Sequence, residues 1–468
     1  MNKRKIINYI FLVIAIISFI VLQYFILKLD IIPKTYYLLF TCIEVFILLI
    51  AGVFSFLKKK VFYITSIVLS VLLIIVNSFG YYYIKHLDKF IDDGFTGDII
   101  SLSTYYLISS SNNEVTSIDD VTLDKTIYYY THSMDNEKAR EKLGNYIYEP
   151  VEKLSDYLNN NTESKSYLLI DKVNYNFYTE LDFEHKDSYK VVYEFDIEKV
   201  EKRNLEVKDV YNIFLVGKDF WGRDDLNLII TINNRTHEVL LTGMTRDLYI
   251  DAVGYGFKDS LTGMYVLGED VVIKSLENFF DITIDYKITV YTENLVDIVD
   301  NIGGIEFCSP IGFRTTHAKV LGTYDDTKGE KMYVPKGCRS YNGIEILTIA
   351  RERKAFNPKG DHQRQENCRQ ILITIAKKLA SMSTLSNYGE VLDSLNGLFQ
   401  TNMNRNTMAL LVRNALEGIE YTVDQSYVGG EQSWREPLGI ERWPGPAIYP
   451  NTNDANNARA KLQEIINK

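Results

Sequence analysis

Apolar residues gather in three long runs at the start of the chain. The runs cover residues 6–27, 36–57 and 61–84, and Glu44 is the only formally charged residue within them. Each run is close to the roughly 20 residues that a helix needs to cross the hydrocarbon core of a bilayer. The first run is too long for a signal-peptide core and lacks a small-residue cleavage site, so all three are predicted to be retained transmembrane helices.

Basic residues around these runs predict their orientation. Three basic residues at 3–5 precede the first run, and three lysines at 58–60 separate the second from the third. Lysine and arginine accumulate on the cytoplasmic side of membrane proteins. The connection between the first two runs carries only Lys28 and Lys34, partly balanced by Asp30. Three crossings from a cytoplasmic N-terminus place everything after about residue 86 outside the cell.

After the apolar runs, short β-prone segments alternate with helical ones. Between about residues 94 and 200 they flank a charged stretch, 137–158, that is predicted to be helical, and we interpret this region as a small α/β domain with a supporting role. The later pattern predicts an α/β sheet covered by helices on both faces. Its expected strands cover 211–216, 227–232, 238–242 and 282–290, and its expected helices cover 269–280 and 292–301.

Charge divides the chain into two unlike parts. The first 90 residues carry a net charge of +7, whereas the remaining 378 carry −17. A strongly acidic outer part argues against nucleic acid as a partner. A cluster of arginines in that outer part is therefore more informative, because acidic residues outnumber basic ones there.

Cysteines are few, and two of them flank a polar insertion. Cys308 and Cys338 could form a disulfide at the base of that insertion in an oxidising exterior, or they could remain two free thiols. The sequence leaves both possibilities open. The spacing of the cysteines and histidines does not match a zinc site.

An arginine-rich stretch follows the insertion. Arg351 and Arg353 stand two apart in a segment predicted to be the end of a strand, so their side chains are expected on the same side. A helix is then predicted to begin at Asp361, with Arg364 in its first turn. Guanidinium groups near a helix N-terminus suit a diphosphate. The alternative is a surface strip of salt bridges with Glu352 and Asp361.

Charged residues also gather where the predicted central strands end. The ends of strands in α/β sheets are common places for binding crevices, although caps and turns collect there too. The residues at these ends are Asp219, Arg223, Asp225, Arg246 and Asp247.

Several short motifs, in this order, resemble the LytR-CpsA-Psr family. They are G-K-D at 217–219, R-D-D-L-N at 223–227, T-R-D at 245–247, I-G-G-I-E at 302–306, and A-R-E-R at 350–353 with G-D-x-x-R-x-x-N at 360–367. Three N-terminal spans followed by an accessory domain resemble the capsule-associated, CpsA-like branch of that family. The resemblance therefore extends over most of the chain.

The resemblance implies a domain order and a fold. The expected fold class is α/β: three transmembrane helices, a small α/β accessory domain and an α/β/α catalytic domain. The expected boundaries are 1–90 for the helices, 91–204 for the accessory domain, 205–385 for the catalytic domain and 386–468 for an extension that completes it.

The resemblance also implies an activity and a location. Members of the family are phosphotransferases in the cell membrane of Gram-positive bacteria, with the catalytic domain outside. They move an anionic glycopolymer, capsular polysaccharide or wall teichoic acid, from polyprenyl pyrophosphate to the 6-hydroxyl of a muramic acid in peptidoglycan. The expected partners are that lipid-linked glycopolymer, peptidoglycan and the membrane, with no nucleic acid.

Site residues are carried over from the family by position. The resemblance implies that Asp219 and Asp225 bind Mg²⁺. It implies that the arginines grip the pyrophosphate, and a magnesium ion with arginine forks is what phosphoryl transfer needs. The expected catalytic residues are Arg246, Asp247, Arg351 and Arg353, and the expected pyrophosphate-binding residues are Arg223, Arg364 and Asn367.

The chain departs from the family pattern at four places. Cys368 stands where relatives have a glutamine, Ser260 begins a segment where relatives have a lysine, and Thr245 replaces a proline before Arg246. The loop between Asp219 and Arg223 is also shorter than in the capsule-associated branch. The departures at Cys368 and Ser260 favour a second hypothesis, a non-catalytic receptor for polyprenyl pyrophosphate. A third is a hydrolase that cleaves the same diphosphate with water. The sequence does not identify the catalytic base.

One predicted helix carries an apolar face. Val271, Val272, Leu276, Phe279 and Phe280 could line a tunnel for a polyprenyl chain or pack as an ordinary core.

Overall fold

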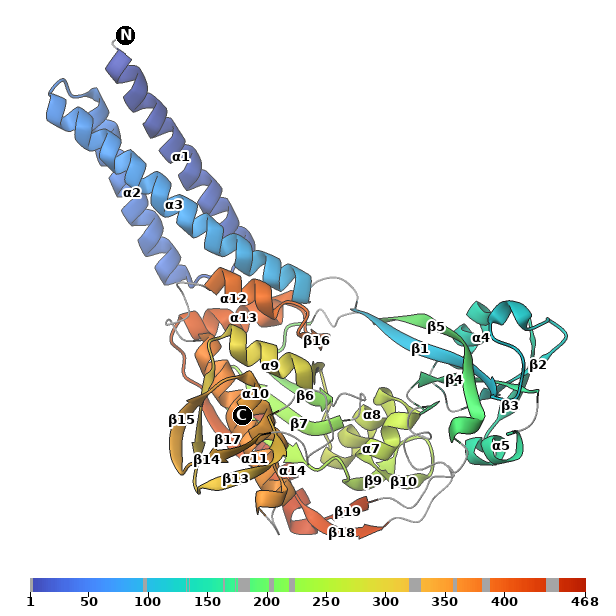
Figure 1. The fold of residues 1–468 in the computed structure, drawn as a ribbon. Helices are drawn as coiled ribbons and strands as arrows, with labels where there is room; N and C mark the ends of the chain where they lie inside the picture. The colour runs from blue at the N-terminus through green and yellow to red at the C-terminus, as the bar shows by residue number, and fades with distance from the viewer. Residues whose placement is uncertain are drawn as a thin grey trace.

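The structure is a computed structural model and shows a helical bundle, a small domain at the side and a larger mixed domain (Figure 1). It describes residues 3–95, 99–131, 133, 135–162, 165–172, 174–175, 186–201, 206–218, 224–319, 330–356, 360–380, 388–434 and 446–468. Asp219 and Arg223 therefore lie outside the described residues.

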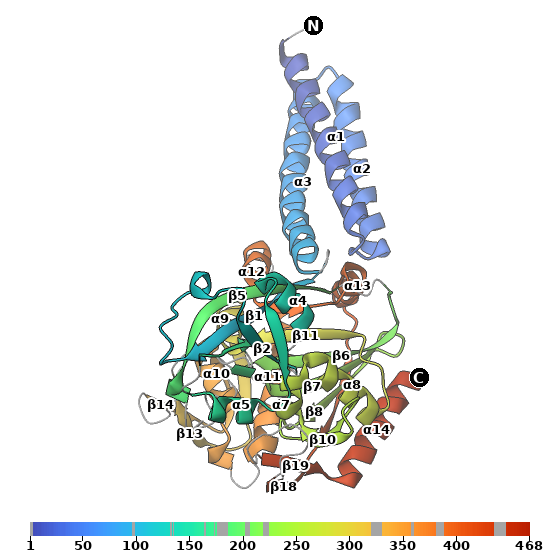
Figure 2. The ribbon, with the colours of Figure 1, turned by 90° about the vertical axis from the view of Figure 1, so that its right-hand side faces the viewer.

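The three apolar runs form three helices that stand together away from the rest of the molecule (Figures 1 and 2). They are α1 (Lys3–Leu29), α2 (Lys34–Phe56) and α3 (Lys60–Phe95). All three are long and apolar enough to cross a membrane, which confirms the prediction of three long apolar helices at the start of the chain. Most of their apolar side chains face outward rather than into a core, as expected for a surface covered by lipid.

Polar side chains inside this bundle pair with one another. The Gln23 amide donates to the Glu44 carboxyl group at 3.1 Å, and the Thr41 hydroxyl donates to Gln23, also at 3.1 Å. Ser66 donates to Asn8 across the bundle at 3.0 Å. Lipid offers no hydrogen bonds, so such groups are retained where helices supply partners for each other.

The outer end of the bundle is joined to the large domain by charge pairs. Asp88 on α3 accepts from Lys28 at 2.9 Å and from Arg405 at 2.8 Å, and Arg405 also pairs with Asp92. Apolar side chains around this contact, among them Phe90, belong to the same buried cluster as the core of the large domain. The domain is thus fixed against the end of the bundle.

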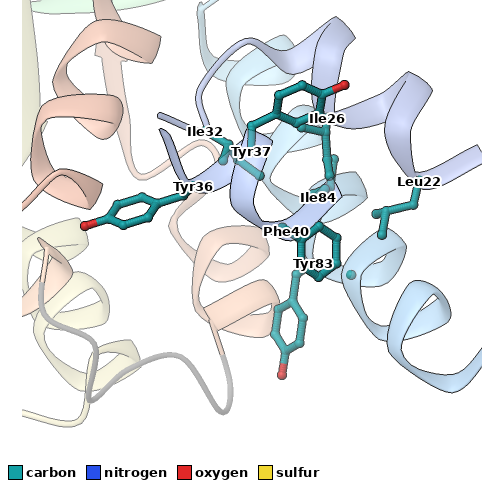
Figure 3. A pocket seen from close by; sticks show the side chains of 9 residues that line it. Leu22, Ile26, Ile32, Tyr36, Tyr37, Phe40, Tyr83 and Ile84 are labelled. Carbon is teal, nitrogen blue, oxygen red and sulfur yellow. The ribbon is translucent and has the colours of Figure 1, made fainter. Parts of the chain in front are cut away.

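A wholly apolar cavity opens between the three helices near this end (Figure 3). Its volume is 360 Å³. Tyr36, Tyr37 and Tyr83 stand around it, which matches the aromatic side chains common at membrane–water boundaries. Gly80 also lines the cavity, and a Cβ there would lie 3.1 Å from the side chain of Leu22.

The side domain is a five-stranded α/β unit. Its elements are β1 (Ile99–Ser110), η1 (Ile118–Asp120), β2 (Thr126–Tyr130), α4 (Asn136–Leu143), β3 (Ile147–Val151), α5 (Leu154–Asn160), β4 (Tyr167–Asp171), η2 (Lys186–Ser188) and β5 (Tyr189–Glu201). The strand order is β3-β2-β4-β1-β5. Helices α4 and α5 belong to separate apolar clusters on its two faces.

One helix predicted in this domain is wrong. Residues 137–158 were expected to form a single charged helix, but the structure divides them into α4, β3 and α5. Gly144 ends α4 with φ +119°, a conformation that L side chains rarely adopt. The following residues then pair with β2 as a parallel strand, so tertiary pairing overrides the local helical composition.

The large domain is built on a six-stranded mixed sheet of order β16-β11-β6-β7-β8-β17. Strands β6, β7 and β8 are antiparallel neighbours, whereas β11 and β17 run parallel to β6 and β8. The predicted strands and helices are confirmed, although the strand expected at 282–290 covers 286–291. They are β6 (Val210–Lys218), β7 (Asp224–Asn233), β8 (Glu238–Met244), α8 (Glu269–Phe280), β11 (Tyr286–Tyr291) and α9 (Thr292–Asn301).

Residues after 386 contribute to the same domain. They supply β16 and β17 to the sheet and α14 to one of its faces. Their elements are α12 (Tyr388–Leu395), β16 (Phe399–Thr401), α13 (Arg405–Leu416), β17 (Thr422–Val428), β18 (Gly430–Trp434), β19 (Pro446–Pro450) and α14 (Thr452–Asn467).

Helices cover both faces of the sheet, which confirms the expected α/β/α layering. On one face α8 and α14 pack against apolar side chains such as Phe214 and Ile229. On the other face α11 (Gly360–Ala380) places Leu372 against Leu228 and its neighbours. Val272, Leu276 and Phe280 of α8 are fully buried within the first of these clusters, as the core interpretation of this helix expects.

The polar insertion is closed at its base by a disulfide. Strands β12 (Ile305–Ser309) and β15 (Gly337–Tyr341) pair so that Cys308 lies opposite Cys338, and the two are bonded. The insertion contains a second pair, β13 (Phe313–Ala318) and β14 (Lys331–Val334). Of the two possibilities that the sequence left open, the structure has the disulfide.

Reduction of this bond is expected to destabilise the large domain. The bond closes a loop of 30 residues, and the chain-entropy argument gives about 3 to 4 kcal/mol for such a loop. Urea unfolding of the full chain in detergent, with and without dithiothreitol, measures the effect. The control is Cys308→Ser with Cys338→Ser, whose midpoint should be low and insensitive to dithiothreitol. An unchanged wild-type midpoint after thiol titration has shown complete reduction would contradict the prediction.

Candidate functional site

Three strand ends meet at one edge of the central sheet. Strand β6 ends at Lys218, β7 begins at Asp224 and β8 ends at Met244. Because β6, β7 and β8 are antiparallel neighbours, these three ends lie side by side. Among the described residues, the edge therefore collects Asp225, Arg246 and Asp247.

Arg246 lies between two carboxylates at this edge. Its Nη1 donates to Asp225 Oδ1, and its Nε lies 3.9 Å from Asp247 Oδ1. The three side chains are between 20% and 24% exposed, so they are accessible yet largely surrounded by protein. A partly buried arginine held by two acids is oriented, and it keeps a face toward solvent.

The backbone of Arg246 is held by the segment that departs from the family pattern. Thr262 donates to the Arg246 carbonyl from its backbone N–H at 3.0 Å and from its hydroxyl at 3.1 Å. Ser260 caps the short helix α7 (Leu261–Met264) by accepting from Gly263 N at 3.1 Å. Sequence reasoning missed Thr262, because its role depends on a contact 16 residues away.

Arg364 reaches the same edge from helix α11, which covers one face of the sheet. It lies in the first turn of α11, is only 4% exposed, and its Nη1 donates to the backbone carbonyl of Asp225 at 2.7 Å. The prediction of a helix that carries Arg364 near its start is confirmed, although the helix begins at Gly360 rather than at Asp361. Asp225 thus joins Arg246 through its side chain and Arg364 through its backbone.

Asn367 lies one turn further along α11. It is buried, and its Oδ1 accepts from Gln363 Nε2 at 3.1 Å. Its amide nitrogen makes no hydrogen bond to the part of the chain that the structure describes. A buried amide donor without such a bond is available to an acceptor on a ligand.

The strand predicted before Arg351 is wrong, because residues Gly343–Arg351 form the helix α10. Asn342 accepts from Glu345 N at 3.1 Å while the Glu345 side chain accepts from Asn342 N, and this capping box starts the helix. Buried Ile346 and Ile349 then hold α10 against the core. Arg351 is the last helical residue and is partly buried.

Arg353 follows two residues later and is exposed, so spacing along a strand does not relate the two side chains. Glu352, which stands between them, is fully buried and bonds to strand β13. The alternative of an exposed salt-bridge strip through Glu352 is therefore wrong. Sequence reasoning did not anticipate this buried carboxylate.

Cys368 and Arg369 connect α11 to its neighbours. The Cys368 thiol donates to the Ala350 carbonyl at 3.5 Å, directly before Arg351. Arg369 is 2% exposed, and its Nε donates to Gln425 at 2.7 Å. Burial lowers the pKa of the Arg369 guanidinium. Gly243 makes room for this guanidinium, since a Cβ there would lie 2.5 Å from Nη1.

A second charged group lies under the edge. Asp224 is 1% exposed, with Lys218 Nζ at 3.9 Å, and the same Nζ lies 4.8 Å from the centre of the Tyr265 ring. Burial, then the negative charges of Asp224 and Glu269, raise the pKa of Tyr265 well above its usual value. Tyr265 is thus a neutral hydroxyl at any physiological pH.

The carboxylates at the edge suit a hard divalent cation. Asp225 and Asp247 offer oxygen ligands, which Mg²⁺ prefers, and both remain partly exposed. Asp219, the other residue expected to bind the metal, lies outside the described residues. Within the part that the structure describes, a separate group of three potential ligands consists of Glu306 with Cys308 and Cys338, whose sulfurs are bonded to each other.

The arrangement as a whole can hold an anion with several negative charges. Arg246 and Arg364 converge on Asp225, while Arg351 ends a helix whose neighbour α11 carries Arg364. Guanidinium groups bind phosphate oxygens in pairs, and a partly buried site strengthens each contact.

Comparison with known proteins agrees with this chemistry. A profile of the LytR_cpsA_psr family matches residues 173–448. The chain is 30% identical over 224 residues to a Bacillus mycoides protein named polyisoprenyl-teichoic acid-peptidoglycan teichoic acid transferase TagU, covering 47% of this chain and 69% of the relative. A Bacillus subtilis protein of the same name is 30% identical over 221 residues, covering 45% of this chain and 67% of the relative.

Solved structures are similar at lower identity. The crystal structure of B. subtilis TagV covers 56% of this chain and 99% of its own, with a TM-score of 0.46 and 22% identity. A structure described as TagT bound to LIIa-WTA covers 57% of this chain and 97% of its own, with a TM-score of 0.44 and 22% identity.

The matched region begins near the end of the side domain, contains the whole edge described above, and spans more than half of the sequence. The chain belongs to the LytR_cpsA_psr family.

Proposed function

We propose that this protein is a membrane-anchored phosphotransferase that moves an anionic glycopolymer from polyprenyl pyrophosphate to peptidoglycan. Relatives named as teichoic acid transferases support a glycopolymer donor of this kind. The observation that carries the proposal is the convergence of Arg246 and Arg364 on Asp225 at one edge of the sheet.

The arginines bind the diphosphate in this proposal. Arg246 reaches it from the sheet and Arg364 from helix α11, and Arg351 and Arg353 contribute from the end of α10. Fixed positive charges stabilise the charge that develops on phosphate oxygens during transfer. Asn367 donates its free amide hydrogens to the same group. Arg223 is given the role of binding the diphosphate from its place in the sequence motif alone.

The acids serve two purposes. Asp225 and Asp247 keep Arg246 aimed at the edge before substrate arrives. Asp219 and Asp225 are the residues that would hold Mg²⁺, which when bound neutralises charge on the diphosphate. Asp247 is a partly exposed carboxylate 3.9 Å from Arg246 Nε and is our candidate for orienting the acceptor hydroxyl.

The departures at two family positions do not remove these groups. Cys368 fills a structural position against Ala350, and Ser260 caps α7. Neither side chain occupies the edge where the arginines converge. The receptor and hydrolase hypotheses therefore remain as alternative outcomes of the experiment below.

The proposed location is the cell membrane of a Gram-positive bacterium. Helices α1, α2 and α3 cross the bilayer from a cytoplasmic N-terminus, and the large domain lies outside, held against the bundle by Arg405. An external domain would meet peptidoglycan directly, and an oxidising exterior suits the disulfide between β12 and β15.

Substitution of the converging residues is expected to abolish transfer without unfolding the protein. Arg364→Ala and Asp225→Asn should each lower the rate by about a hundredfold or more, because each removes a charge contact of about 2 to 4 kcal/mol from the transition state. The assay mixes the full chain in detergent with a short polyprenyl-pyrophosphate oligosaccharide, Mg²⁺ and uncrosslinked peptidoglycan, and measures polyprenyl monophosphate release and sugar on the glycan.

The matched control is Arg235→Ala. Arg235 is exposed in the turn between β7 and β8, at the opposite end of the same strands. Its loss should leave transfer unchanged. Release of monophosphate without sugar on the glycan would indicate the hydrolase instead, and tight binding of the lipid without turnover would indicate the receptor.

Cysteine labelling tests the proposed topology. In a Cys42→Ser background, Asn112→Cys lies in an exposed turn of the side domain and Lys59→Cys lies between α2 and α3. A membrane-impermeant maleimide should label Asn112→Cys in intact protoplasts and Lys59→Cys only after permeabilisation. The reverse pattern would overturn the orientation.

A further inference from the structure

We propose that Glu352 is a positioning residue that sets the two arginines on either side of it, Arg351 and Arg353, for diphosphate binding. The inference rests on the proposed function and concerns how one part of that site is built. The observation behind it is unexpected: Glu352, which stands between the two arginines in the sequence, has a side chain that is fully buried.

Both carboxylate oxygens of Glu352 accept hydrogen bonds from backbone N–H groups. Oε2 accepts from Thr316 N at 2.5 Å, and Oε1 accepts from Ala355 N at 2.9 Å. The Thr316 hydroxyl lies 2.9 Å from Oε1 and 3.1 Å from Oε2, and it donates to the same group. A buried ionised carboxylate is costly unless donors of this kind surround it.

This geometry requires a group with two acceptor oxygens. Glutamine has nearly the same shape, but one of its two terminal atoms is an NH₂ donor. In place of Glu352 it would direct that NH₂ at the N–H of either Thr316 or Ala355. The substitution therefore breaks one side of the contact and leaves a buried donor facing another donor.

The bonds of Glu352 tie the arginine segment to the insertion. Thr316 lies on β13, whose Phe313 ring packs 4.7 Å from the ring of Phe356, just beyond Arg353. The base of the insertion is closed by the disulfide between β12 and β15. The support for the segment is thus a covalently closed hairpin rather than a free loop.

The other side of Arg353 is blocked by the start of α11. A Cβ at Gly360 would lie 2.4 Å from the Arg353 carbonyl oxygen, so only glycine allows this approach. Glu352 and Gly360 together confine the backbone between α10 and α11. Two guanidinium groups that leave this backbone can bind one diphosphate only if their starting points are fixed to within about half an ångström.

The test is the affinity of the full chain in detergent for inorganic pyrophosphate, measured by titration calorimetry with Mg²⁺ present. Glu352→Gln should weaken binding about tenfold, the effect of losing roughly one charge-assisted hydrogen bond. Thr316→Val removes the hydroxyl donor and should weaken binding less, whereas Thr316→Ser keeps the donor and should bind as the wild type does.

The variant Asn342→Ala tests whether Glu352 affects binding only through the overall stability of the protein. This change removes the N-cap of α10 at the end far from the arginines and should cost about 1 kcal/mol of stability. It should lower the unfolding midpoint while leaving the dissociation constant for pyrophosphate unchanged. If Asn342→Ala weakens binding as much as Glu352→Gln does, general loss of stability explains both and the proposal is overturned.

The remaining outcomes separate this inference from the function on which it rests. Wild-type affinity in folded Glu352→Gln and in Thr316→Val overturns the role of Glu352 alone. Failure of the wild-type chain itself to bind pyrophosphate overturns the proposed diphosphate site, and the role of Glu352 with it. If Glu352→Gln does not fold, the difference between Thr316→Val and Thr316→Ser decides the question.

Discussion

The site depends on one residue that serves two layers of the fold. Asp225 holds Arg246 through its carboxylate and Arg364 through its backbone carbonyl. The first arginine follows a strand of the sheet, and the second comes from a helix that covers it. The negative charge of the carboxylate orients Arg246, and the hydrogen bond to the backbone carbonyl orients Arg364, before any ligand arrives. Preorganisation of this kind lowers the cost of ordering flexible side chains on binding.

Antiparallel pairing explains why this convergence occurs at an edge. The antiparallel strands β6, β7 and β8 place Lys218, Asp225 and Arg246 at one edge, although up to 28 residues separate them. The sheet brings the motifs to one edge, and α11 closes it from one face. Segments from the C-terminal part also take part, because Ile448 N donates to the Asp247 carbonyl at 2.7 Å. Charged loops alone would not hold these positions.

Residue patterns predicted the repetitive parts of the fold and much of the charge at the site. The apolar runs, the central strands and the helices α8 and α9 follow from local periodicity. The strand before Arg351 was wrong, because the apolar run Ile346–Ala350 suits a short buried helix as well as a strand. Thr262 and Glu352 could not be found in this way, since each acts through contacts with residues 16 to 36 positions away. A glutamate between two arginines looks like a surface ion pair until its burial is known.

The membrane end and the site end are linked through a single core. Arg405 binds Asp88 on α3, while Phe90 belongs to the buried cluster that also contains Ile349 and Cys368. This cluster therefore reaches from the end of the bundle to the residues that precede Arg351. In the proposed function, the reactive group of a lipid-linked substrate would lie at a fixed height above the bilayer, and a firm connection to the bundle would keep the arginines within reach of that height. The charge pairs at Asp88 would thus affect the height of the proposed diphosphate site, as well as the attachment of the domain.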